Sequence, residues 1–169
     1  MKKTAILLGV LLAGCASKPV PPSWQPNARD ALDAFTDAYL KGATPAANAE
    51  FARARRETAS TGKFEHVAQA ELVRCAAQAA SLDFDGCPGF AKLAQDGTPQ
   101  QRAYAAYLDG RWQGLDAALL PEQHRPVVAS GQVAAVQDPL SRLVAAGAAF
   151  KAQRITPEGI EQAVTTASD

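Results

Sequence analysis

Along most of the chain, apolar side chains recur every three or four residues, which is the spacing of one face of an α-helix. The clearest stripe lies within Lys63–Leu82 and is formed by Phe64, Val67, Ala68, Leu72, Cys75, Ala79 and Leu82. We predict that this segment is a helix and that the stripe faces the core.

The starts of several other helices are marked by a polar capping residue followed by proline. A capping side chain accepts a hydrogen bond from the first turn, and proline fits there because its missing N–H would have no intrahelical acceptor. This signature predicts helices that begin at Thr44-Pro45, Thr98-Pro99, Asp138-Pro139 and Thr156-Pro157.

Less regular signals mark the remaining elements. Asn27, with Asp30 in the capping-box position, predicts the first helix, and Cys87-Pro88 opens a short one. Further predicted features are helix ends at Gly42 and Gly62, a helical face formed by Trp112, Leu115 and Leu119, a helical or irregular connector over 127–137, and Ile160 and Val164 as anchors of the last helix.

These elements predict an all-α domain over residues 27–169, an irregular bundle or array of about six to eight short antiparallel helices. The chain holds 37 alanines, which favour this class because alanine has the highest helix propensity. An alternative comes from Gly62-Lys63-Phe64 and Gly110-Arg111-Trp112, which resemble the inter-helix turns of tetratricopeptide repeats. Their separation of 48 residues departs from the roughly 34 of that repeat, so tetratricopeptide-like hairpins remain the alternative.

The first 15 residues have a different character. Lys2 and Lys3 precede an apolar run, Thr4–Leu12, that is shorter than the roughly 20 residues of a membrane-spanning helix but fits a signal peptide. The run ends in Leu12-Ala13-Gly14-Cys15, which resembles the lipobox of bacterial lipoproteins. A plain signal peptide with an incidental cysteine, or an uncleaved anchor, is the alternative.

The lipoprotein resemblance implies a cellular location for the whole protein. Residues 1–14 would be removed as the signal peptide, and Cys15 would carry the acyl chains that hold the protein in a lipid bilayer. Ala16 and Ser17 follow the cysteine, where lipoproteins of the inner membrane often have Asp. The resemblance therefore implies sorting to the outer membrane, with the domain facing the periplasm.

Residues 15–26 are expected to be a linker, because Pro19, Pro21, Pro22 and Pro26 disfavour helix and favour an extended spacer. Trp24 is expected to pack back onto the first helix, with a position at the membrane interface as the alternative.

Cys75 and Cys87 are the two cysteines left after Cys15, and an oxidising periplasm favours a disulfide between them. The alternative is two small buried apolar residues. His66 and His124 form no zinc-binding spacing and are expected on the surface, so we predict neither a metal nor another cofactor. Asp83 and Asp85 hint at a calcium loop but lack the distal Glu, which favours a solvated turn.

The net charge and the absence of known motifs limit the classes of function to be considered. Loss of Lys2 and Lys3 lowers Lys and Arg from 17 to 15 against 17 Asp and Glu, so the mature net charge of −2 gives no reason to expect nucleic-acid binding. Arg53 and Arg56 could bind a phosphate, but the acids beside them favour a solvated helix face. No nucleophile elbow or phosphate loop occurs.

We therefore expect a non-enzymatic, membrane-anchored scaffold or accessory subunit that binds another envelope protein. The alternative is a small cell-wall enzyme whose acid/base pair is not visible in the sequence. Tyr104, Tyr107 and Trp112 are the candidate partner-binding residues, because Tyr and Trp are favoured interface anchors. The competing interpretation is that these three rings fill the core.

Overall fold

The computed structural model describes residues 22–168 and confirms the predicted all-α fold. No β-strand occurs within this range. In chain order the elements are α1 (Trp24–Leu40), α2 (Thr44–Ala59), α3 (Phe64–Ala80), α4 (Pro88–Ala91), α5 (Pro99–Leu108), η1 (Ala117–Leu119), η2 (Glu122–His124), α6 (Arg125–Ser130), η3 (Val133–Ala135), α7 (Pro139–Lys151) and α8 (Pro157–Ser168), where η marks a 3₁₀ helix.

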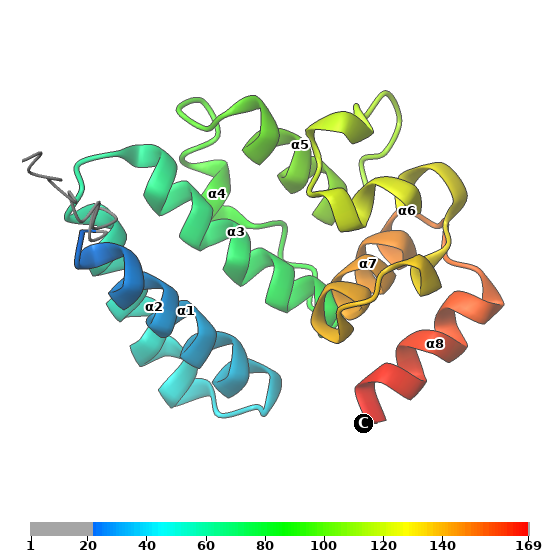
Figure 1. The fold of residues 1–169 in the computed structure, drawn as a ribbon, viewed down its shortest axis with the longest axis horizontal. Helices are drawn as coiled ribbons and strands as arrows, with labels where there is room; N and C mark the ends of the chain where they lie inside the picture. The colour runs from blue at the N-terminus through cyan, green and yellow to red at the C-terminus, as the bar shows by residue number, and fades with distance from the viewer. Residues whose placement is uncertain (1–21, 169) are drawn as a thin grey trace, which may run out of the picture.

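The helix α3 lies at the centre of the fold. Figure 1 shows the α1–α2 pair on one side of it and α5 and α7 on the other. Its side chains enter three core clusters: Ala77 joins that of α1 and α2, Leu72 that of α4 and α5, and Cys75 and Ala79 that of α5 and α7. Because α3 is covered on several sides, the single stripe predicted for it describes its burial incompletely.

The prediction that the stripe faces the core is wrong at its two ends. Phe64 is 61% exposed and Leu82 is 56% exposed. Phe64 is the first residue of α3, and Leu82 lies beyond its last residue in a turn where its φ is +58°. Neither position is therefore covered by the neighbouring helices that bury the middle of α3.

Small residues allow α3 and α7 to approach each other closely. Ala79 of α3 and Ala145 and Ala148 of α7 are all buried in the largest cluster. At Gly147 a β-carbon would lie 1.9 Å from the carbonyl oxygen of Ala79, so no other residue fits without separating the helices. The alanine-rich composition thus sets how tightly the central helices pack.

The predicted disulfide between Cys75 and Cys87 is confirmed, with the two Cα atoms 5.5 Å apart. It links α3 to the residue before α4, across a sequence separation of 12. Next to this link lies the carboxylate of Glu71, which is 3% exposed and pairs with Arg55 at 3.1 Å. The same carboxylate packs against Gly89 of α4 so closely that a side chain at position 89 would collide with it. The disulfide therefore holds α4 against the buried carboxylate of Glu71, whose partner Arg55 is exposed.

Loss of this disulfide is expected to lower the free energy of unfolding by about 3 kcal/mol, because closing a 12-residue loop restricts the unfolded chain. Urea unfolding of the Cys75→Ala/Cys87→Ala variant against the oxidised protein measures the difference. Adding a reductant should destabilise the parent to a similar extent and leave the variant unchanged. Two reactive thiols in the unfolded, unreduced protein would contradict the bridge.

The first helix starts earlier than its predicted cap. It begins at Trp24, so Asn27 lies inside α1 and its side-chain amide donates to Glu57 Oε2 at 3.5 Å. Pro26 is accommodated because the N–H groups of a first turn have no intrahelical acceptor. The predicted linker 15–26 therefore overlaps α1 at its last three positions. Trp24 stacks on His66 of α3, with ring centroids 4.5 Å apart.

Three other predicted caps are present. Thr98 and Gln101 form a reciprocal capping box at the start of α5. The carboxylate of Asp138 accepts from the Ser141 N–H at 2.7 Å, and Thr156 Oγ accepts from the Gly159 N–H at 3.1 Å.

The helical face predicted for Trp112, Leu115 and Leu119 is wrong. Gly110 and Gly114 have φ values of +72° and +71°, so the chain turns twice and forms only the short η1 before Pro121. The turn at Gly62 does join two helices, but the one at Gly110 does not, so these two turns do not form equivalent tetratricopeptide-like hairpins. The connector 127–137 contains the C-terminal part of α6 and η3.

The predicted anchors of the last helix are also wrong. Ile160 and Val164 of α8 are 49% and 62% exposed, whereas Gly159 is buried and Ala163 packs against the main cluster. The helix therefore approaches η3 and α7 through its small residues, because these allow the shorter distance.

Candidate functional site

The described residues enclose a groove whose floor is formed by α3. It has a volume of about 540 Å³ and is bordered by α1, α5, the η1 segment and α7. We call it the α3 groove. The partly buried apolar side chains of its lining are Val73, Ala76, Tyr104, Leu119 and Leu140.

Polar groups occur around this apolar lining without forming an acid/base pair. They come from Thr36, Gln69, Gln100, Gln101 and Arg125. The lining includes no carboxylate or imidazole, and within residues 22–168 no three His, Cys, Asp or Glu side chains are grouped as metal ligands. The groove can therefore bury apolar side chains and donate hydrogen bonds at its edge, which are the properties of a binding surface.

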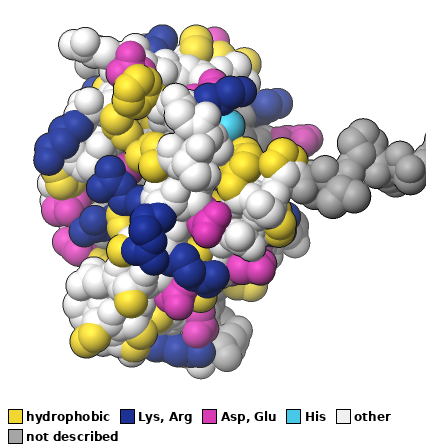
Figure 2. Space-filling view, turned by 90° about the vertical axis from the view of Figure 1, so that its left-hand side faces the viewer, with side chains coloured by type: hydrophobic (Ala, Val, Ile, Leu, Met, Phe, Trp, Pro, Cys, Tyr) yellow, Lys and Arg dark blue, Asp and Glu magenta, His cyan; other side chains and the backbone are white. Residues whose placement is uncertain are grey.

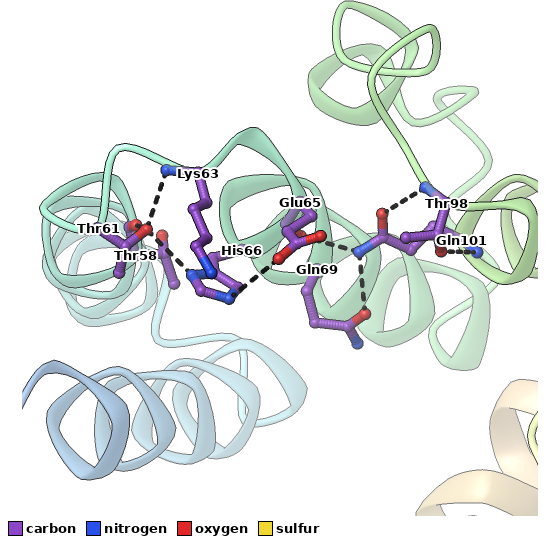
Figure 3. A network of polar contacts seen from close by, with 8 residues as sticks. All are labelled: Thr58, Thr61, Lys63, Glu65, His66, Gln69, Thr98 and Gln101. Carbon is purple, nitrogen blue, oxygen red and sulfur yellow. Dashed lines mark hydrogen bonds and ion pairs between the residues drawn. The ribbon is translucent and has the colours of Figure 1, made fainter. Parts of the chain in front are cut away.

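One wall of the groove is held in place by Gln101. Besides its role in the capping box, its Nε2 donates to the Glu65 carbonyl oxygen at 2.8 Å and approaches Gln69 Oε1 at 3.5 Å. Figure 3 shows this side chain reaching from α5 to the first turns of α3. Because Gln101 is buried and has these partners, α5 keeps a defined position relative to the groove floor.

The same network continues toward the α2–α3 turn. His66 Nδ1 lies 3.0 Å from Thr61 Oγ, and its Nε2 lies 3.6 Å from Glu65 Oε1 (Figure 3). Thr61 Oγ in turn donates to the Thr58 carbonyl at 2.7 Å. His66 is thus a partly buried link between three segments, and its ring also supports Trp24.

The three candidate partner-binding residues have different environments. Tyr107 is fully buried and Trp112 is 8% exposed, so the core interpretation holds for both, and neither side chain can anchor a partner. Their rings stack 5.3 Å apart, and the indole Nε1 donates to the Tyr107 carbonyl oxygen at 2.9 Å. Of the three, Tyr104 alone lines the α3 groove, where its side chain is partly buried.

His124 lies behind this groove, contrary to the predicted surface position. It is 2% exposed, and its Nδ1 is hydrogen-bonded to the Tyr107 hydroxyl at 3.2 Å. Burial lowers the pKa of His124 to about 4, although the charge of Asp138 acts in the opposite direction. The imidazole therefore stays uncharged within the aromatic cluster at neutral pH.

The free energy of unfolding is expected to fall by up to about 3 kcal/mol as the pH decreases from 6.5 to 4, because protonation favours the unfolded chain. In the folded protein the pKa of His124 is about 4, below its ordinary 6.5, so the unfolded state binds the proton first. Urea unfolding across this range measures the slope. His124→Gln should remove it and His66→Gln should retain it; equal slopes in both variants would contradict the assignment.

The charged residues of α1 and α2 form pairs along the helices. Arg53 binds Glu50 at 2.7 Å, and Lys41 binds Asp37 at 2.6 Å. In Figure 2, Lys and Arg side chains are interspersed with Asp and Glu side chains across the face shown. This mixture favours the predicted solvated helix face over a phosphate site at Arg53 and Arg56.

The two acids of the turn after α3 have structural partners. Tyr39 donates its hydroxyl to Asp83 at 2.9 Å, and Gln78 donates to Asp85 at 2.9 Å. Burial together with the bond to Asp83 raises the pKa of Tyr39 to about 12, so the phenol remains a donor at neutral pH. The turn is thus tied to α1 and α3.

The predicted signal peptide and the lipidation site Cys15 lie outside the described residues. None of the described helices is long and apolar enough to cross a membrane. No family model, curated protein or solved structure matches this chain.

Sequence reasoning missed most of this site. Leu119 belongs to a predicted helical face, but its spacing in the sequence does not tell whether a neighbouring element covers it. Gln101 had a signal in its capping box, whereas Arg125 and Val73 had none. The groove exists because α3 is covered by four elements distant in sequence that leave part of its side open.

Proposed function

We propose that this protein is an outer-membrane lipoprotein whose periplasmic domain acts as a scaffold or accessory subunit and docks a helical segment of a protein partner in the α3 groove. The observation that carries the proposal is a groove with a largely apolar lining that is only partly covered by the rest of the domain, bordered by the side-chain amides of Gln69 and Gln100 and by Arg125. An amphipathic helix buries its apolar face in grooves of this kind and leaves its polar side in water.

The anchoring part of the proposal depends on Cys15. Acylation there would hold the domain at the bilayer and confine its partners to the same surface, which raises their effective concentration. In cells, Cys15→Ala is expected to leave the precursor uncleaved or to move the protein out of the detergent phase. Detergent partitioning and processing identical to the parent would contradict lipidation at this residue.

The binding part is tested by a photo-cross-linking residue at Leu119 in the lipidated full-length chain, expressed in its own envelope. Adducts with a protein partner are expected, and Val73→Arg should abolish them by placing a long charged side chain in the groove. Gln113→Arg, an exposed position near η1 outside the lining, is the matched control and should retain the adducts. No adduct from Leu119 in the folded parent would contradict the binding function.

A cell-wall enzyme would need carboxyl or imidazole groups that converge on a substrate. The α3 groove supplies neither, so the proposal is restricted to binding.

A further inference from the structure

Besides the α3 groove, one helix of this chain has an apolar face that no described residue covers. In α8, Ile160 and Val164 are 49% and 62% exposed and are one helical turn apart. Ala167, three residues after Val164, is also exposed and lies on the same side of the helix. We call Ile160, Val164 and Ala167 the α8 stripe.

We propose that the α8 stripe of a second copy of this chain occupies the α3 groove. This inference rests on the proposed binding function and names the partner of that site. It combines the apolar groove with an exposed apolar helix face of the same chain, spaced as an amphipathic ligand requires.

The charges of the two surfaces are complementary. The charged side chain in the groove lining is Arg125, whose Nε donates to the Leu120 carbonyl oxygen at 2.9 Å. Within residues 22–168 no carboxylate forms an ion pair with it. The helix α8 carries Glu158 and Glu161 and no Lys or Arg. Glu161 follows Ile160 by one position, about 100° around the helix, and so borders the stripe.

The position of α8 allows two copies to exchange this contact reciprocally. Leu140, at the start of α7, lines the groove, and Arg142, two residues further along α7, donates from Nη1 to Thr166 of α8 at 3.2 Å. Groove and stripe therefore both border the start of α7, in the region where Figure 1 shows α8 beside α7. A reciprocal contact closes on itself and produces a dimer rather than an open chain.

A single helix face buries less area than a stable interface in solution needs, so the contact requires a high local concentration. Lipid-anchored copies in one membrane meet that requirement. The experiment therefore uses the full-length lipidated chain in native membranes, with a photo-cross-linking residue at Val164 and two differently tagged copies.

We expect adducts that contain both tags, have twice the mass of one chain and join Val164 to a peptide of the groove lining. Arg125→Glu and Glu161→Arg should each lower the dimer yield about fivefold, equivalent to about 1 kcal/mol for an ion pair. The combination of the two should restore the yield. Glu158→Arg is the matched control, because it makes the same charge change about 160° around the helix from Ile160 and should leave the yield unchanged.

Three outcomes would overturn the proposal: no adduct carrying both tags, adducts of Val164 with a different protein, or a charge swap that does not recover the yield. Larger species instead of a dimer would contradict the reciprocal arrangement. The Leu119 probe separates this failure from failure of the binding function. If Leu119 still captures a different protein and Val73→Arg abolishes that capture, the groove binds a partner other than this chain.

Discussion

Trp112→Ala is expected to lower the free energy of unfolding by about 3–5 kcal/mol, the usual cost of removing a buried aromatic side chain. The indole is 8% exposed, stacks on Tyr107 and donates to the Tyr107 carbonyl oxygen. It belongs to the largest core cluster, together with Leu120 and Val127, which lie later in the chain. Its removal would leave a cavity in this cluster, and urea unfolding monitored by circular dichroism measures the loss.

Two further variants make this prediction specific. Trp24→Ala removes the other tryptophan, which is only half-buried and stacks on His66, and should cost about 1 kcal/mol. Trp112→Phe keeps a ring over Tyr107 but loses the N–H donor, so an intermediate loss is expected. If Trp112→Ala and Trp24→Ala destabilise the protein equally, Trp112 is not a central core residue.

Gly147→Ala is expected to destabilise the protein by more than about 3 kcal/mol, above the usual cost of one added methyl group in a packed core. The new β-carbon would meet the carbonyl oxygen of Ala79 at 1.9 Å, and this atom belongs to the backbone of α3 and cannot rotate away. The two central helices must therefore separate. The higher helix propensity of alanine, worth at most about 1 kcal/mol, does not offset this.

Gly159→Ala is the control, because it also adds one methyl group to a buried helical glycine. Its nearest neighbour would be Ile155 Cγ1 at 3.2 Å, a side-chain atom that can shift. A change within about 1 kcal/mol of the parent is expected there. Equal melting temperatures for Gly147→Ala and the parent would show that α3 and α7 are not in direct contact at this position.

Much of the fold was predictable because local signals dominate in a helical chain. The box at Thr98 and Gln101 satisfies the first N–H groups of α5 within five residues, and the same holds for Asp138 and Ser141 at α7. The disulfide was predictable from the number of cysteines and the expected compartment. The predictions failed where a turn interrupts a regular pattern, as at Gly110 and Gly114, whose positive φ values direct Trp112 into the core.

The candidate site was much less predictable than the fold. Tyr104, Tyr107 and Trp112 were identified together, yet only Tyr104 lines the α3 groove while the other two fill the core beside it. Periodicity places side chains on one face of a helix but does not tell which neighbour covers that face. For the same reason Ile160 and Val164, predicted as anchors, are exposed.

The helical class, most helix starts, the cysteine pair and the resemblance of residues 1–15 to a lipoprotein leader could be recognised without a structure, because each depends on residues close together in the chain. Three features became visible only in the folded chain: which apolar faces remain open, how closely α3 and α7 approach, and the burial that keeps His124 neutral. These features depend on contacts between segments far apart in sequence. Their free energies come from the burial of particular atoms, which no local pattern specifies.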